Sequence, residues 1–291
     1  MGIGSVTAMG IGVTVYSIPL EQMPAVLANP TPEYAEALMW MNNVTQIFTF
    51  LFPVLFFFLL FGGKNVNQLL LSKGGILVLL SPVLMFFANG IIDISAKINK
   101  AMIPENSFLE RAFKPTEEMA ERITKLMLDL DTTVPMWLTF LSIAIIPALL
   151  EELSFRGVVQ PLLAKMTGNV HAAIWITAAL FSLIHVQFYG FLPRMLMGAL
   201  LGYLVIWSGS LWASILAHFA NNALAIVLYR QFGSLETPEG ATMNQWYSYL
   251  ISAALFLMLL VHFIRKSKWP WLSFAYLGIT GKISQGHEEK N

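Results

Sequence analysis

Two adjacent glutamates at the end of an apolar run are the first residues whose types and spacing could do chemistry. Glu151 and Glu152 follow the uncharged stretch Met136–Leu150, and Arg156 comes four residues after Glu152. A charge at the centre of a membrane helix costs about 2.5–3.5 kcal/mol on insertion scales. On a helix, Glu152 and Arg156 share a face and can pair, whereas Glu151 points about 100° away without a local partner. The spacing predicts a structural role for Glu152 and a chemical role for Glu151; alternatively, both glutamates mark a helix end at the membrane interface.

Two further polar pairs interrupt apolar segments later in the chain. Phe181 and His185 are four residues apart, and so are His218 and Asn222. Each pair would lie one turn apart on one helix face. A single membrane histidine is most often a hydrogen-bond partner between helices. Two histidines, an asparagine, two glutamates and an arginine on three helices instead favour a shared polar cavity inside the bundle.

These residue types are suited to hydrolysis. Glu151 and His185 could bind and deprotonate a water molecule. His218 and Asn222 could then donate hydrogen bonds to the oxyanion that forms when the water attacks a carbonyl group. The same residues could hold a zinc ion instead. Because the compact H-E-x-x-H spacing is absent, we favour a metal-free site without a cofactor, with zinc as the alternative.

Composition places the chain in a membrane. Of 291 residues, 56% are hydrophobic and 12% charged, and the mean hydropathy is +0.66. Soluble domains carry about 25% charged residues. A net charge of zero argues against a nucleic-acid partner, and the absence of cysteine excludes disulfides and thiolate catalysis. We expect a single membrane domain over residues 1–291 and no cleavable signal peptide, because no basic residues precede the first apolar stretch.

Hydropathy predicts an all-α integral membrane protein with about eight transmembrane helices, each long enough to cross a bilayer. Pro147 lies one turn before Glu151 and should kink its helix and free a backbone carbonyl. The predicted spans cover residues 1–18, 42–61, 74–92, 134–165, 169–187, 191–207, 210–230 and 246–264.

The longest polar region, residues 94–133, contains an amphipathic pattern. We predict a helix over residues 115–131, capped by Thr116, with one apolar stripe at helical spacing. Such a helix either lies on the membrane surface or packs on the bundle. The alternative is a mobile lid over a site.

The distribution of Lys and Arg predicts the orientation. The polar loop 19–41 has no Lys or Arg, the turn 62–73 has two, and the polar tail 265–291 begins with a basic cluster. Positive charges favour the cytoplasmic side. We therefore predict that both termini lie in the cytoplasm.

The three motifs resemble those of a known family. Glu151-Glu152-x-x-x-Arg156, Phe181-x-x-x-His185 and His218-x-x-x-Asn222, in this order, are similar to the motifs of the CPBP family, which includes CAAX prenyl endopeptidases of the Ras-converting type and bacterial relatives linked to bacteriocin self-immunity. The resemblance covers residues 134–230. It implies an eight-helix intramembrane protease in which Glu151 and His185 activate water and His218 and Asn222 stabilise the oxyanion. Glu152, Arg156 and Phe181 take supporting positions. The resemblance to bacterial members also implies a bacterial cytoplasmic membrane.

Three functions compete on this basis. The first is an intramembrane endopeptidase acting on a membrane-bound peptide or protein, lipidated or CAAX-like. The second is a non-catalytic immunity or peptide-binding protein that uses the same cavity. The third is a transporter, since membrane Glu and His also relay protons. No internal repeat with paired broken helices is present, which argues against transport, and a pure binder needs no water-activating and oxyanion groups.

Overall fold

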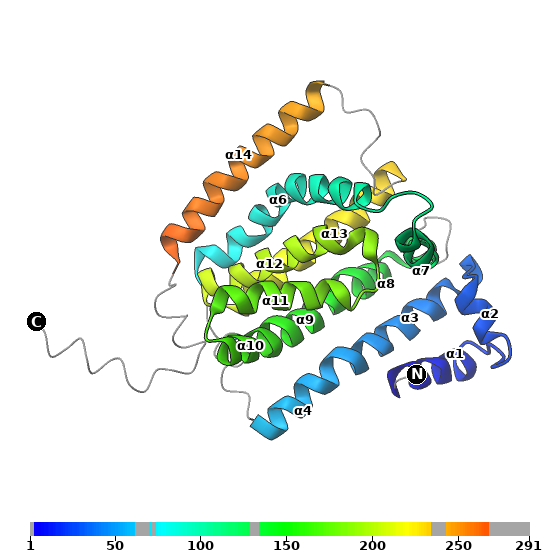
Figure 1. Cartoon of the computed structure of the whole chain (residues 1–291). Helices are drawn as coiled ribbons and strands as arrows, with labels where there is room; N and C mark the ends of the chain where they lie inside the picture. Colours follow the sequence, from blue (N-terminus) through cyan, green and yellow to red (C-terminus); the bar gives the residue numbers. More distant parts are fainter. Residues whose placement is uncertain (1–2, 62–69, 71–73, 129–133, 234–242, 268–291) are drawn as a thin grey trace, which may run out of the picture.

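The computed structural model describes residues 3–61, 70, 74–128, 134–233 and 243–267, and within these residues it is built of helices without strands (Figure 1). Five short helical segments, η1 to η5, join or interrupt the α-helices. The α-helices are α1 (Ile3–Thr14), α2 (Met23–Ala28), α3 (Ala35–Gln46), α4 (Phe52–Phe61), α6 (Ile76–Ala101), α7 (Phe108–Leu128), α8 (Met136–Phe140), α9 (Ile146–Glu152), α10 (Gln160–Thr167), α11 (Val170–Leu183), α12 (Phe191–Ser208), α13 (Leu211–Phe232) and α14 (Met243–Lys266). The five short segments are η1 (Pro32–Tyr34), η2 (Ile47–Leu51), η3 (Leu141–Ile145), η4 (Leu153–Val159) and η5 (Phe188–Gly190).

Six continuous helices of the described chain are long and apolar enough to cross a membrane. They indicate an integral membrane protein, as the composition predicted. The other two predicted spans coincide with shorter apolar helices, Gly4–Thr14 and Val170–Leu183. A count of eight crossings therefore stays a prediction, as does the orientation. The six long helices are Pro32–Leu60, Ile76–Ala101, Met136–Thr167, Phe188–Ser208, Leu211–Phe232 and Tyr247–Lys266.

The bundle is centred on α12 and α13. Figure 1 shows α14 covering α6, and α6 in turn packs on α12 and α13. On the other side lie α11 and the long helix of α8 to α10, followed by α3 and α4. Gly168 and Gly209 end α10 and α12 with positive φ angles of 65° and 69°. Glycine adopts this conformation at little cost, so the chain reverses there and sets α11 beside α10 and α13 beside α12.

The long helix Met136–Thr167 is irregular around its glutamates. The π-helical segments η3 and η4 flank α9, which ends at Glu152. Pro147 lies in the first turn of α9 and cannot donate a backbone hydrogen bond. Wider turns of this kind occur mostly as local interruptions of α-helices, often at functional sites.

The amphipathic helix begins earlier than predicted. α7 starts at Phe108, so Thr116 is inside the helix and does not cap it. The cap is Ser107, whose hydroxyl accepts a hydrogen bond from the Glu110 backbone N–H, while the Glu110 carboxylate accepts from the Asn106 backbone N–H. The two bonds resemble a capping box, except that the Glu110 carboxylate bonds to the N–H of the residue before the cap and not to that of Ser107. The end of the predicted helix, residues 129–131, lies outside the described residues.

α7 packs on the bundle rather than standing away from it. Leu126, Met127 and Leu128 near its C-terminal end are buried, and Phe113 near its start stacks on Phe188 with ring centroids 4.6 Å apart. The packed alternative of the sequence analysis therefore describes this structure. Two predicted polar regions are also partly helical: α2 and the start of α3 fall in loop 19–41, and α6 continues to Ala101. The turn 62–73, apart from residue 70, and the tail from residue 268 lie outside the described residues.

Candidate active site

Glu152 is the best-bonded member of the predicted set. Its Oε1 accepts hydrogen bonds from Arg156 Nη1 at 2.7 Å and from His218 Nδ1 at 2.9 Å. The side chains of Glu152 and Arg156 are both 0% exposed. The predicted ion pair is therefore present, and the structure adds His218 as a partner that the spacing did not reveal. We call Glu152, Arg156 and His218 the Glu152 cluster.

A glycine on α12 completes the bonding of Arg156. Arg156 Nη2 donates to the Gly198 carbonyl at 2.7 Å. A β-carbon at Gly198 would lie 3.3 Å from that same nitrogen and 3.3 Å from the Ala178 backbone. The small residues on α11 and α12 therefore let the two backbones approach and bring the carbonyl within reach of the guanidinium.

Glu151 is buried but lacks such bonds. The residue is only 7% exposed, and its Oε2 lies 4.0 Å from His218 Nε2. That separation is too long for a direct hydrogen bond. No described residue donates a hydrogen bond to this carboxylate within normal range. The two adjacent glutamates thus face the two nitrogens of the His218 imidazole. Glu152 is hydrogen-bonded to Nδ1, whereas Glu151 is too far from Nε2 to form a hydrogen bond.

Asn222 lies one turn after His218 on α13, as predicted, and is tied to the irregular helix. Its Nδ2 donates to the Ile143 carbonyl at 3.0 Å. In a regular α-helix that carbonyl would accept from the backbone N–H at position 147, which Pro147 lacks. The predicted freed carbonyl thus orients the Asn222 carboxamide, whose second N–H is left for another acceptor.

His185 lies in a turn and not on a helix, contrary to the predicted span 169–187. α11 ends at Leu183, and His185 Nδ1 is 2.7 Å from the Phe181 carbonyl. Since a carbonyl can only accept, Nδ1 carries the proton and Nε2 has the free lone pair of a base. The next residue, Val186, has a φ of 54°, which is strained for a β-branched side chain. Such strain clusters at functional sites.

The ring of Phe181 joins the two halves of the site. It contacts the rings of His185 and His218 edge-on, with centroids 5.1 Å and 6.0 Å away. The Arg156 guanidinium lies over its face, 4.8 Å from the centroid, a favourable placement for a cation. Phe181 thus has a supporting position, and the three predicted motifs come together around it.

Asn99 is a site residue that the sequence analysis did not identify. Its Nδ2 donates to the Phe188 carbonyl at 2.8 Å, and its Oδ1 accepts from the Leu192 N–H at 2.7 Å. The Asn99 side chain therefore holds the backbone at Phe188 and at Leu192, in the segment that follows His185. We call residues 184–190 the His185 turn. The sequence does offer a signal for Asn99, because Ser95 and Asn99 are polar residues at i,i+4 spacing and would share one helix face. In the structure both side chains are buried.

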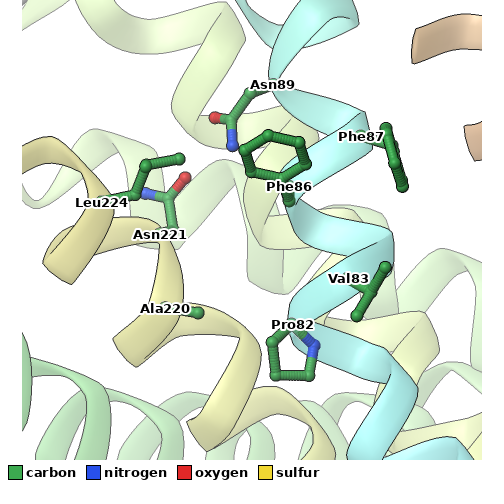
Figure 2. Close-up of a pocket in the computed structure, with 8 residues that line it drawn as sticks. All are labelled: Pro82, Val83, Phe86, Phe87, Asn89, Ala220, Asn221 and Leu224. Carbon is green, nitrogen blue, oxygen red and sulfur yellow. The ribbon is translucent and has the colours of Figure 1, made fainter. Parts of the chain in front are cut away.

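Two apolar hollows adjoin the site. Figure 2 shows the first, of about 390 Å³, between α6 and α13, with Asn89 and Asn221 among apolar residues. Asn221 Nδ2 lies 3.3 Å from Asn222 Oδ1. The second, of about 370 Å³, is lined by residues that include Phe155 and Ile184, the residue before His185 in the chain. No group of three or more His, Asp or Glu side chains placed to hold a metal ion occurs among the described residues.

The fold and the cluster define a helical integral membrane protein in which three segments bring together buried or half-buried Glu, His, Arg and Asn side chains. The family described as type II CAAX prenyl endopeptidase Rce1-like matches residues 133–224, which include all three motifs. The resemblance to CAAX-type proteases is therefore confirmed over this segment. No curated protein and no solved structure matches the chain.

Proposed function

We propose that the protein is an intramembrane endopeptidase that hydrolyses a peptide bond of a membrane-associated substrate, lipidated or CAAX-like. The observation that carries this proposal is the contrast between two adjacent buried glutamates. Glu152 is bonded to Arg156 and His218, whereas no described residue hydrogen-bonds to the Glu151 carboxylate. A buried carboxylate without hydrogen bonds is costly, and a base for water accounts for it. The family match supports the same reaction class.

The first step is the attack of water. We assign the binding of the water molecule to the Glu151 carboxylate and to Nε2 of His185, whose Nδ1 proton is held by the Phe181 carbonyl. Glu151 takes one proton of the water as its oxygen bonds to the carbonyl carbon of the substrate. The carbonyl π bond breaks, and the oxygen becomes an oxyanion. The apolar hollow beside Ile184 offers room for apolar parts of the substrate.

The oxyanion accepts two hydrogen bonds in this mechanism. In this mechanism His218 donates through both ring nitrogens: Nδ1–H to the Glu152 carboxylate, and Nε2–H to the oxyanion. The Asn222 N–H that is not bonded to Ile143 is the second donor. Glu151 then passes its proton to the amide nitrogen, the C–N bond breaks, and an amine and a carboxylic acid leave.

We propose that this reaction needs no metal ion. The test is to measure activity and bound zinc in purified protein before and after a strong chelator. We expect little zinc and unchanged activity. Stoichiometric zinc that is lost together with activity would make Glu151, His185 and His218 ligands.

The proposed function is tested by cleavage of a membrane-bound peptide reporter in proteoliposomes. We expect the wild-type protein to cut the reporter and Glu151→Gln to lose cleavage, because glutamine keeps the shape but cannot take the proton. Melting temperatures must show that both proteins are folded. A well-folded Glu151→Gln protein with full activity would refute the mechanism. Failure of the wild type to cut any substrate would favour the non-catalytic peptide-binding or immunity protein.

A further inference from the structure

Asn221 and Asn222 are adjacent asparagines on α13, and the mechanism above uses only Asn222. Both side chains are half-buried and lie near the middle of the membrane-spanning helix Leu211–Phe232. Polar side chains at such a depth serve mainly as hydrogen-bond partners between helices or as functional groups. The role of Asn221 therefore follows from what its carboxamide bonds to.

The hydrogen bonds fix which way both carboxamides face. Asn222 Nδ2 lies 3.0 Å from the Ile143 carbonyl, and since a carbonyl can only accept, this atom must be the nitrogen. Asn222 Oδ1 then lies on the other side of the group, where Asn221 Nδ2 donates to it at 3.3 Å. The reverse orientation of Asn222 would place two acceptors against each other. The Asn222 carboxamide is therefore held through both of its polar atoms.

The bond from Asn221 matters because a single bond would leave the Asn222 carboxamide free to turn. The χ2 torsion of asparagine has a broad energy profile, so its angle is set by the partners of the group. The Ile143 carbonyl accepts one Nδ2–H, and the bond to Oδ1 fixes the plane in which the second N–H lies. A donor that is oriented in advance stabilises an oxyanion without reorganisation during the reaction.

Asn221 also lines the apolar hollow between α6 and α13. Figure 2 shows Asn221 on α13 and Asn89 on α6, among residues that are otherwise apolar. Asn89 Nδ2 donates to the Met85 carbonyl of its own helix at 3.2 Å. Of these two asparagines, Asn221 is the one that bonds to Asn222. Asn89 is therefore a matched control in the same hollow.

We propose that Asn221 is a positioning residue, which orients the Asn222 carboxamide so that the second Nδ2–H of Asn222 points at the oxyanion. This proposal rests on the proposed function, in which Asn222 is an oxyanion donor. Asn221 does not touch the substrate and acts only through Asn222. The segment His218-x-x-Asn221-Asn222 thus carries two oxyanion donors and the residue that orients one of them.

The first test measures the orientation of Asn222 without any reaction. The full chain is prepared with isotope-labelled asparagine in lipid nanodiscs, and NMR relaxation gives the order parameter of the Asn222 side-chain NH2 group. Its signal is assigned by its loss in Asn222→Ala. Asn221→Leu keeps the approximate shape of the side chain and should lower this order parameter clearly. Asn89→Leu, the same substitution on the other side of the hollow, should leave it unchanged.

The second test is cleavage of the membrane-bound peptide reporter in proteoliposomes. Asn221→Leu should lower kcat about fivefold, the effect of one neutral hydrogen bond. KM should stay unchanged, because the oxyanion forms only in the transition state. Asn89→Leu should keep both constants. In an Asn222→Ala background, Asn221→Leu should cause no further loss, because the side chain through which it acts is gone.

Asn221→Asp separates a hydrogen-bond donor from a side chain that only fills space. An ionised carboxylate can only accept and would face Asn222 Oδ1, whereas a protonated carboxyl group can donate to it. The ratio of kcat for Asn221→Asp to kcat for the wild type should therefore rise as the pH is lowered. The same ratio for Asn221→Leu should stay constant.

Three results would overturn the proposal. They are an unchanged order parameter of Asn222 in Asn221→Leu, an equal loss of kcat with and without Asn222, and a loss of activity that follows a lower melting temperature and does not respond to pH in Asn221→Asp. The last would show that Asn221 only stabilises the fold. If the wild type cleaves nothing, the proposed function fails, and the NMR comparison alone decides whether Asn221 orients Asn222.

Discussion

The Glu152 cluster and the His185 turn both contact Phe181, but they are held in opposite ways. In the Glu152 cluster, the charged groups bond to one another and to the Gly198 carbonyl, fully buried. In the His185 turn, the neutral Asn99 side chain of α6 and the Arg194 guanidinium of α12 bond to the backbone, and the reactive imidazole nitrogen points away from its one hydrogen bond. In the first arrangement each charged side chain bonds to another buried group, whereas in the second Nε2 of His185 is left open for another partner.

This difference separates residues that maintain the structure from residues that can react. A buried charge that is paired cannot leave its partner without a large loss of stability. A buried polar group that is not paired can bind a water molecule or a substrate group. We therefore expect substitutions in the Glu152 cluster to lower stability, and substitutions around Glu151 and His185 to lower activity with little effect on folding.

Next to the complete loss of cleavage expected for Glu151→Gln, the largest expected effect on activity is that of His185→Ala. Loss of a general base or of its water contact lowers rates by about 10²–10⁴-fold. Combining it with Glu151→Gln should add nothing, because groups that act as a unit are strongly non-additive. The measurement is reporter cleavage in proteoliposomes, with melting temperature as the control for folding. Additive losses would show that the two residues act in separate steps.

Arg156→Ala is expected to have the largest effect on stability. Removing one partner of a buried ion pair leaves the Glu152 carboxylate uncompensated and costs about 3–5 kcal/mol. Arg194→Ala is the matched control, since Arg194 forms no ion pair among the described residues. Thermal unfolding in detergent should show a much larger drop for Arg156→Ala. Equal melting temperatures of wild type and Arg156→Ala would contradict the structural assignment of the pair.

Asn222→Ala is expected to have a smaller effect than His185→Ala. It removes one oxyanion donor, which costs about 10²–10³-fold in rate in other enzymes. It also leaves the Ile143 carbonyl without its side-chain donor, so a modest drop in melting temperature should accompany it. Residual cleavage should be measurable in a long incubation with excess enzyme. Wild-type rates in Asn222→Ala would remove Asn222 from the oxyanion site.

Local periodicity predicted the parts of the site that lie on single helices. The Glu152–Arg156 pair and the placement of Asn222 one turn after His218 follow from i,i+4 spacing alone. The carbonyl freed by Pro147 was also predictable, because the missing N–H is a property of the residue. These features need no knowledge of the neighbouring helices.

The features that the sequence did not predict depend on contacts between segments that lie far apart in the chain. α11 ends before His185 because the following residues bond to Asn99 of α6, about a third of the chain away. The bond of His218 to Glu152 likewise depends on how α13 packs on α9. The start of α7, in contrast, could have been predicted from the sequence, because Ser107-x-x-Glu110 has the spacing of a helix-capping signal. The predicted start at residue 115 relied instead on the apolar stripe further along the helix.

The most direct test of this account compares Glu151→Gln with Glu152→Gln, identical substitutions at adjacent buried positions. Cleavage of the reporter and melting temperature are measured for both proteins. We expect Glu151→Gln to melt like the wild type and to cut nothing. Glu152→Gln should melt much lower, because it leaves Arg156 without a counter-charge at a cost of about 3–5 kcal/mol. An active Glu151→Gln, or a Glu152→Gln protein as stable as the wild type, would contradict the division of roles between the two glutamates.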